Sequence, residues 1–191
     1  MNVRKTIFTI AVAGLMLFWS VAQALFIWVD PSAPTELQMS NDIRPSDIDT
    51  INRMVRSGEL NQVRTVVLWD SVGGHVDTAL DIGRWIHAHN LTTNVIGDCA
   101  SACVHIALAG ANKFISDGGA LHVHWMYLPN DSYMTPVQVS HTIQDSLRSI
   151  WSYTESVGGK ADAYVYLMMN AGPDLDRLSK AEAQNIGFVY R

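Results

Sequence analysis

An alternation of short β-branched runs with helical segments constrains the fold of this chain most strongly. Val63–Trp69 is a largely apolar run typical of a strand buried on both faces, and a helix is predicted from Val76 to about His87. Thr92–Ile96 is a second short strand, after which Cys99–Leu108 is predicted to be a buried helix. Strands that alternate with helices form βαβ units, which produce a mainly parallel sheet. The sequence therefore predicts an α/β fold.

The flanking segments extend this pattern over a single domain. The chain has 191 residues, enough for one hydrophobic core but too few for two ordinary domains. Thr35–Met39 is predicted to be an edge strand, and a helix begins at Pro45. In the C-terminal half, two further strands are predicted at Lys113–Ile115 and Ala120–Trp125. Three further helices are predicted: one from Pro136 to a break at Gly158, one over Asp162–Asn170 and one that begins at Ser179.

The N-terminal segment indicates export or membrane insertion. Arg4 and Lys5 precede Ile7–Val29, a run without a charged residue. Ala22-Gln23-Ala24 is a small-x-small cleavage signal, which would make residues 1–24 a secretory signal peptide. The full run instead has roughly the 20 residues of a spanning helix, and its apolar continuation past Ala24 favours an uncleaved signal anchor.

Both interpretations place the rest of the chain outside the cytoplasm. The expected location is the periplasm, either anchored to the inner membrane by the N-terminal helix or secreted after cleavage. The predicted organisation is residues 1–30 as this signal peptide or transmembrane helix, residues 31–35 as a linker, and residues 36–191 as the folded domain.

Charge and cysteine content exclude several classes of function. The net charge of −5 leaves no basic excess for a nucleic-acid backbone, so nucleic acid is not an expected partner. Cys99 and Cys103 are the only two cysteines of the sequence, too few for the usual zinc ligand set. Their spacing in an exported protein permits a disulfide without requiring one. We expect no metal and no cofactor.

Ser101 is the first candidate for chemistry. It lies in the turn between a predicted strand and a predicted helix, where unpaired backbone N–H groups and the helix dipole favour a developing oxyanion. Serine is also a common helix cap, and this alternative is the favoured one when the segment is taken alone. Gly73-Gly74 forms a second strand-to-helix turn, whose backbone amides could approach a ligand closely.

Histidines supply the candidate general bases. His122 and His124 alternate along one predicted strand and are expected to share a face, with Val123 on the other. His105 follows Ser101 by one helical turn and is a minor candidate for the same role. No carboxylate or cysteine lies at a spacing that would complete a metal site with the histidine pair.

Taken in chain order, these elements resemble the Clp protease proteolytic subunit and its exported bacterial relatives. The segment Asp70–Val76 is similar to the Ser-Pro-Gly-Gly-x-Val turn of that family, and Gly97–Cys103 is similar to its Gly-x-Ala-Ala-Ser-Met nucleophile turn. Its Cys-Ala-Ser-Ala-Cys form is closer to the exported relatives. Leu121–His124 and Leu178–Gly187 are similar to two later segments of the family. The resemblance covers residues 36–190 and implies a ClpP/crotonase-like fold of stacked ββα units.

The resemblance also implies a serine endopeptidase that acts by acyl transfer. It assigns the nucleophile to Ser101, the base to His124, and the oxyanion donors to Gly73, Gly74 and Ala102. The aspartate of the family falls between two carboxylates of this chain; we prefer Asp174, and Asp176 is the alternative. Implied partners are peptides or unfolded and membrane-associated proteins, together with other copies of the chain in a homo-oligomer.

Two further functions are weighed against this one. The first is a Ser–Lys peptidase of the signal-peptide-peptidase type, for which Lys113 and Lys160 are the available lysines. The second is a non-catalytic binding module that retains the fold without hydrolysis, since a fold does not fix a function.

Overall fold

The computed structural model describes residues 25–125 and 134–191, and its largest layer is a six-stranded sheet. The strand order is β1-β2-β4-β6-β8-β11, and all neighbours are parallel except β1 and β2. The prediction of an α/β fold with a mainly parallel sheet is confirmed. The strand bounds are β1 Phe26–Val29, β2 Glu36–Ser40, β4 Thr65–Leu68, β6 Thr92–Val95, β8 Lys113–Ile115 and β11 Val189–Tyr190.

Two small sheets lie beside the large one and carry the polar residues of interest. In the first, β3 (Asp42–Ile43) pairs in parallel with β5 (Gly73–Gly74). In the second, β9 (Ala120–Val123) lies between β7 (Asp98–Ala100) and β10 (Asp176–Arg177). Each of β5 and β7 follows a strand of the large sheet along the chain, as the ββα arrangement requires.

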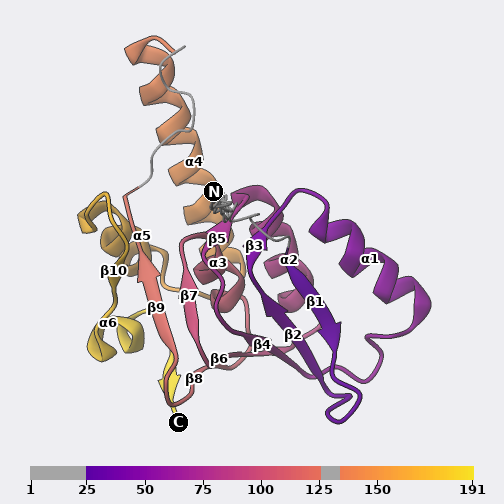
Figure 1. Ribbon diagram of the computed structural model, residues 1–191. Coiled ribbons are helices and arrows are strands. Elements are labelled where there is room, and N and C mark those ends of the chain that lie inside the picture. The colour runs from indigo at the N-terminus through magenta and orange to yellow at the C-terminus, as the bar shows by residue number, and fades with distance from the viewer. Residues whose placement is uncertain (1–24, 126–133) are drawn as a thin grey trace, which may run out of the picture.

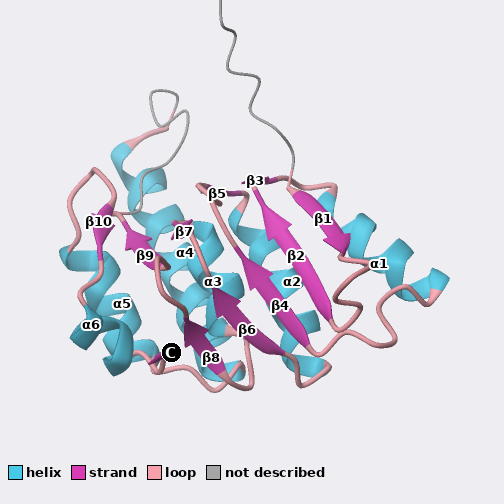
Figure 2. Ribbon diagram, turned by 60° about the horizontal axis from the view of Figure 1, so that its bottom comes forward, coloured by secondary structure: helices cyan, strands magenta, loops and turns pink. Residues whose placement is uncertain are grey.

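Helices cover one face of the large sheet and flank the small ones. In Figure 2, α2 and α3 lie behind the strands, whereas Figure 1 shows α4 projecting away from the rest of the domain. The helix bounds are α1 Asp47–Ser57, α2 Val76–Ala88, α3 Ala102–Leu108, α4 Pro136–Ser156, α5 Ala161–Asn170 and α6 Lys180–Asn185.

The hydrophobic core fixes the position of α3. All seven residues of this helix are buried, so the helix belongs to the core, with His105 at the groove. Its neighbour α2 contributes the apolar stripe that the sequence predicts, including the fully buried Ile82 and Ile86. Val66, Val67 and Leu68 of β4 are all buried, as expected of a strand covered on both faces. The buried helix therefore holds the residues at its N-terminus in a fixed position.

The structure differs from the sequence prediction at the N-terminal edge of the domain. The expected apolar helix extended to Val29, but Phe26–Val29 forms β1, which pairs antiparallel with β2. As a result β2 is an interior strand of the sheet, not the predicted edge strand. Residues 1–24, on which the rest of that expectation depends, lie outside the described residues. Among the described residues, no helix has both the length and the hydropathy of a membrane span.

A second difference concerns the segment that carries Ser101. The predicted helix over Cys99–Leu108 begins only at Ala102, because Asp98–Ala100 forms β7 and pairs in parallel with β9. The predicted strand over Ala120–Trp125 likewise ends at Val123. Ser101 and His124 consequently each follow the last residue of one of two neighbouring strands, β7 and β9.

Candidate active site

Ser101 occupies the junction between β7 and α3 in an unusual backbone conformation. Its φ and ψ are 54° and −123°, a region that a residue with a Cβ rarely adopts and that costs about 1–3 kcal/mol. The surrounding hydrogen bonds hold this conformation: the Ser101 N–H donates to the His122 carbonyl at 2.9 Å, and the Val104 N–H donates to the Ser101 carbonyl at 3.0 Å. The turn presents the Ser101 hydroxyl away from the buried helix and into a groove.

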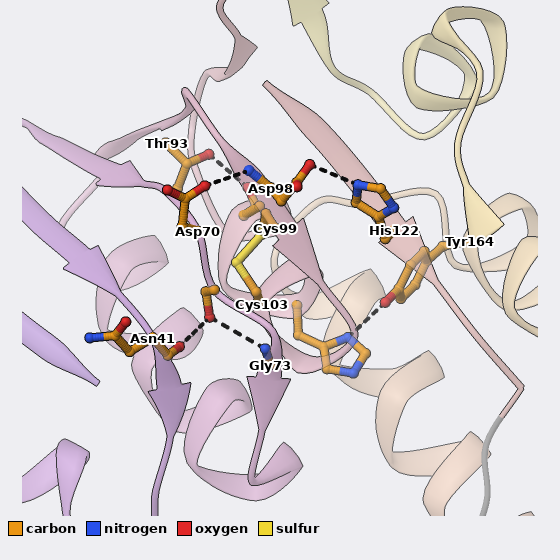
Figure 3. The surroundings of a disulfide bond; sticks show 12 residues. Asn41, Asp70, Gly73, Thr93, Asp98, Cys99, Cys103, His122 and Tyr164 are labelled. Atoms are coloured by element: carbon orange, nitrogen blue, oxygen red, sulfur yellow. Dashed lines mark hydrogen bonds and ion pairs between the residues drawn. A yellow bond between two sulfur atoms is a disulfide. The ribbon is translucent and has the colours of Figure 1, made fainter. Parts of the chain in front are cut away.

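A disulfide joins the two sides of this turn. Cys99 on β7 and Cys103 on α3 are bonded, with their Cα atoms 5.3 Å apart, and both residues are fully buried. Figure 3 shows the bond running from the strand to the helix. Because Ser101 lies between the two cysteines in the sequence, the covalent link closes a small ring around the candidate nucleophile.

His124 contacts Ser101 with the geometry that a general base requires. Its Nε2 lies 2.7 Å from the Ser101 Oγ, and its Nδ1 lies 2.7 Å from the carbonyl oxygen of Trp125. A carbonyl oxygen can only accept, so Nδ1 carries a proton and donates it to Trp125. In the neutral imidazole, Nε2 then has the lone pair that accepts the Ser101 hydroxyl proton. The structure thus fixes the tautomer in which His124 can deprotonate Ser101.

The glycine turn packs directly against the same serine. A Cβ added to Gly73, whose φ is 91°, would fall 2.7 Å from the Ser101 Cβ and 2.8 Å from the Ala102 nitrogen. Only glycine fits this approach. A Cβ on Gly74 would collide with the Ile43 carbonyl of β3. Ala102 is the first residue of α3, so its N–H has no acceptor within the helix.

Ser71 ties the glycine turn to the nucleophile strand. Its hydroxyl donates to the Asn41 carbonyl at 2.6 Å, and it accepts from the Gly73 N–H at a long 3.4 Å. Its backbone also bonds on both sides to β7, through the Asp98 carbonyl and the Ala100 N–H, each at 2.8 Å. The buried serine therefore holds Gly73 in register with Ser101.

A groove of about 920 Å³ runs past these groups. Its lining includes Ser101, His124 and Val123, together with the glycine turn that packs against Ser101. Much of the remaining lining is apolar or aromatic, as in most small-molecule and peptide sites. These further lining residues come from β3 and the adjoining loop, α3, α4, α5 and the segment before β10: Asp42, Ile43, Arg44, His105, Ile150, Tyr164, Met168, Pro173, Asp174 and Leu175.

His105 lies deep in this groove and remains neutral. The residue is 2% exposed, and its Nδ1 is 3.0 Å from the Tyr164 hydroxyl. Burial, with a smaller contribution from His124, lowers the pKa of His105 to about 4. Burial likewise raises the pKa of the Tyr164 hydroxyl well above its usual range, so this pair is uncharged at neutral pH. His105 is hydrogen-bonded to Tyr164, and the histidine that contacts Ser101 Oγ is His124.

The remaining predicted residues are placed less centrally. Asp174 lines the groove and is exposed, whereas Asp176 lies on β10 and accepts a hydrogen bond from the Gly172 N–H at 2.6 Å. His122 lies within β9 and meets Asp98 at 2.9 Å, whereas His124 lies just past the end of the strand and contacts Ser101. Lys113 and Lys160 are absent from the described groove lining, which gives a Ser–Lys pair with either lysine no support.

Three features of the site were missed by sequence reasoning. The Trp125 carbonyl orients His124, but a backbone acceptor leaves no signal in a residue pattern. Tyr164 reaches His105 across 59 residues of sequence, and its segment was predicted only as a helix. Ser71, next to the glycines, carried a weak signal: a buried hydroxyl at a strand end often has a structural partner.

Comparisons with known proteins identify the fold. No protein-family model matches the chain, and no curated protein matches its sequence. Among solved structures, a variant of the membrane-bound stomatin-specific protease 1510-N matches with a TM-score of 0.56 at 18% identity, covering 81% of this chain and 77% of that one. A second variant of that protease, in complex with a substrate peptide, gives 0.58 at 18% identity and covers 81% and 73%.

A variant of ClpP1 from Listeria monocytogenes matches with a TM-score of 0.54 at 18% identity, covering 83% of this chain and 92% of that one. The chain therefore has the Clp-protease-like fold, as the sequence resemblance implied. At this identity the likeness establishes the architecture alone.

Proposed function

We propose that this chain is a serine peptidase-like hydrolase in which Ser101 is the nucleophile and His124 is the general base. The observation that carries the proposal is the 2.7 Å contact between Ser101 Oγ and His124 Nε2, in the tautomer fixed by the Trp125 carbonyl. A serine that merely caps a helix has no need of an oriented imidazole on its hydroxyl. The Ser101 side chain makes no capping bond to α3, which argues further against that role.

The proposed reaction is acyl transfer through a covalent intermediate. His124 Nε2 accepts the Ser101 proton as Oγ attacks a peptide carbonyl, and the imidazolium then protonates the leaving amine. Water, deprotonated by the same nitrogen, hydrolyses the acyl-enzyme and regenerates Ser101. The Trp125 carbonyl holds the ring throughout and stabilises the Nδ1 proton when the ring is charged.

The oxyanion is proposed to be stabilised by backbone amides beside Ser101. The Ala102 N–H has no acceptor within α3, and Gly73 is pressed against it. Donors of this kind typically contribute 10²–10³-fold to rate. The long bond from the Gly73 N–H to Ser71 Oγ is weak enough for a substrate oxygen to replace it. Gly74 remains a predicted contributor.

Asp174 is proposed to assist His124 from the groove wall, and peptides or unfolded proteins are the proposed substrates. An apolar groove with polar groups gathered near one serine supports a peptide ligand, and one fold neighbour is described with a substrate peptide. Assembly into a homo-oligomer also stays a prediction, which analytical ultracentrifugation of the purified protein tests.

We also propose that the protein works outside the cytoplasm. The buried Cys99–Cys103 disulfide supports an oxidising compartment. The sequence favours an uncleaved anchor, but the pairing of Phe26–Val29 as β1 supports a signal sequence that ends before Leu25, with cleavage after Ala22-Gln23-Ala24. N-terminal sequencing of the protein recovered from a periplasmic fraction should then begin at Leu25; recovery of the uncleaved chain in membranes would support the anchor instead.

A fluorophosphonate probe tests the central proposal, since it forms a covalent bond only with an activated serine. Wild type should be labelled at Ser101, the Ser101→Ala variant should not be labelled, and His124→Ala should react at least about 100-fold more slowly. His122→Ala is the matched control and should label within a few-fold of wild type. Failure of folded wild type to label, under conditions where a known fold relative labels, would favour the binding-module alternative.

A further inference from the structure

Besides His124, the groove is lined by His105, which takes no part in the contact between Ser101 and His124. His105 follows Ser101 by one turn of α3 and lines the same groove. Ser101 is the non-helical N-cap of α3, so what relates the two side chains is the groove that both residues line. The His105 ring is therefore placed to meet the substrate residue whose carbonyl Ser101 attacks.

The hydrogen bond to Tyr164 determines which ring nitrogen of His105 carries the proton. If Nδ1 donated to Tyr164, the hydroxyl hydrogen of Tyr164 would have no acceptor among the described residues. Leaving a buried donor unpaired costs about 1–3 kcal/mol. The favoured arrangement is therefore that Tyr164 donates to Nδ1, which places the ring proton on Nε2.

The Nε2–H of His105 has no hydrogen-bond partner among the described residues. In that part of the chain, the indole nitrogen of Trp85 is the one fully enclosed side-chain polar atom that lacks a partner. Nε2 of His105 therefore retains some exposure, and the space that His105 lines is the groove. Tyr153 and Tyr164 stack edge-on against the ring, which holds it in place.

From this placement we infer that His105 is a specificity-determining residue: its Nε2–H donates a hydrogen bond to an uncharged acceptor on the substrate side chain beside the attacked carbonyl. The inference rests on the proposed function and adds a substrate class to it, namely peptides with asparagine or glutamine at that position. The neutral donor is fixed by Tyr164 within an apolar wall formed by Ile150, Val123 and Met168.

An amide side chain fits this wall better than a hydrocarbon or a carboxylate. Leucine, the isostere of asparagine, would leave the Nε2–H desolvated and unpaired. A carboxylate would lose its hydration in exchange for a neutral partner, because burial opposes protonation of His105. A site built to hydrogen-bond its substrate discriminates strongly against analogues that lack the bond.

Fluorogenic peptides that differ only at this residue test the inference, as the pairs asparagine/leucine and glutamine/methionine. Wild type should prefer each amide by about tenfold or more in kcat/KM, the effect of one buried hydrogen bond. In His105→Leu the preference should collapse to within about threefold or reverse. The surface variant His87→Leu is the matched histidine control and should retain the wild-type ratio.

A second variant covers the case in which His105→Leu fails to fold. Tyr164→Phe keeps the ring but releases Nδ1, so the proton can move between the nitrogens and the preference should fall about threefold or more. An unchanged asparagine/leucine ratio in a folded His105→Leu protein, or in folded Tyr164→Phe if the former is unfolded, would overturn the inference.

Fluorescence anisotropy with the same peptides separates this inference from the proposed function. If the fluorophosphonate probe labels Ser101 but the ratio does not depend on His105, hydrolysis stands and the role of His105 is refuted. If the probe does not label, binding of the peptide pairs to Ser101→Ala and to Ser101→Ala/His105→Leu still measures the same preference without hydrolysis. A His105-dependent amide preference in binding then supports the inference although the proposed function fails, and its absence overturns the inference too.

Discussion

Cys99 and Cys103 are disulfide-bonded on either side of Ser101, one within β7 and the other in the first turn of α3. The bond therefore connects the two elements whose junction holds Ser101 at positive φ. Strained conformations of this kind persist only where the surrounding structure over-determines them. The disulfide, the buried α3 and the bonds to Ser71 together supply that constraint.

Removing this disulfide should destabilise the protein and slow acylation. With a sequence separation of 4 the closed ring is small, and the chain-entropy relation gives a contribution of about 2 kcal/mol. In a domain of this size, that corresponds to a fall in Tm of about 4–8 °C. We expect the Cys99→Ala/Cys103→Ala variant to show this fall, together with slower fluorophosphonate labelling.

Wild type treated with a dithiol reductant is the control, because it loses the bond without losing side-chain volume. Thermal unfolding and labelling are measured with and without reductant. Identical labelling rates for oxidised and fully reduced wild type would show that the disulfide does not position Ser101.

Replacing Gly73 with alanine should impair the site more than the fold. A Cβ at Gly73 would collide with the Ala100 carbonyl and with the Ala102 nitrogen, so the nucleophile turn must shift. Displacing one oxyanion donor should slow labelling by about 100-fold or more. Gly158→Ala is the matched control: it also has positive φ, but a Cβ there meets nothing within 4 Å.

Both alanine variants should lose about 1–2 kcal/mol of stability from the positive φ alone, as measured by urea unfolding. If Gly73→Ala labels as fast as Gly158→Ala, Gly73 does not hold the active geometry of Ser101.

Two isosteric variants test which aspartate, Asp174 or Asp176, assists His124. Asp174 lines the groove, whereas the Asp176 carboxylate is bonded to the Gly172 N–H. We expect Asp174→Asn to lower kcat/KM by about tenfold or more, with Asp176→Asn close to wild type. The Trp125 carbonyl already fixes the imidazole tautomer, so the loss should be smaller than in a triad that depends on its aspartate alone. The reverse order of the two variants would move the assignment to Asp176.

His105 should make the stability of the protein depend on pH. Its pKa falls from 6.5 to about 4 on folding, because the ring is desolvated. The unfolded state therefore binds more protons between these values, and stability is present above pH 6.5 and lost as the pH falls toward 4. The slope should approach about 1.4 kcal/mol per pH unit within this window.

Urea unfolding of wild type and His105→Leu between pH 4 and 7.5 measures this contribution. The free energy of unfolding of wild type minus that of His105→Leu should fall as the pH falls, since the leucine does not titrate. A difference that stays constant over the window would mean that folding does not lower the pKa of His105.

The sequence by itself determined the elements whose pattern is local. The run around β4 and the apolar stripe of α2 were predicted because burial on two faces and helical periodicity are written in neighbouring residues. The resemblance in chain order identified Ser101, the glycine turn and His124 as one candidate site, but it gave no distances between them.

The tertiary structure decided whatever depends on distant partners. Phe26–Val29 is as apolar as a membrane segment, and only pairing with β2 makes it a strand. Asp98–Ala100 is likewise extended because β9, some twenty residues later, supplies its hydrogen bonds. The Trp125 carbonyl and the Tyr164 hydroxyl fix the two imidazole tautomers, although no residue pattern connects either group to its histidine. Hydrogen bonds of this kind depend on positions in space, and the folded chain alone sets those positions.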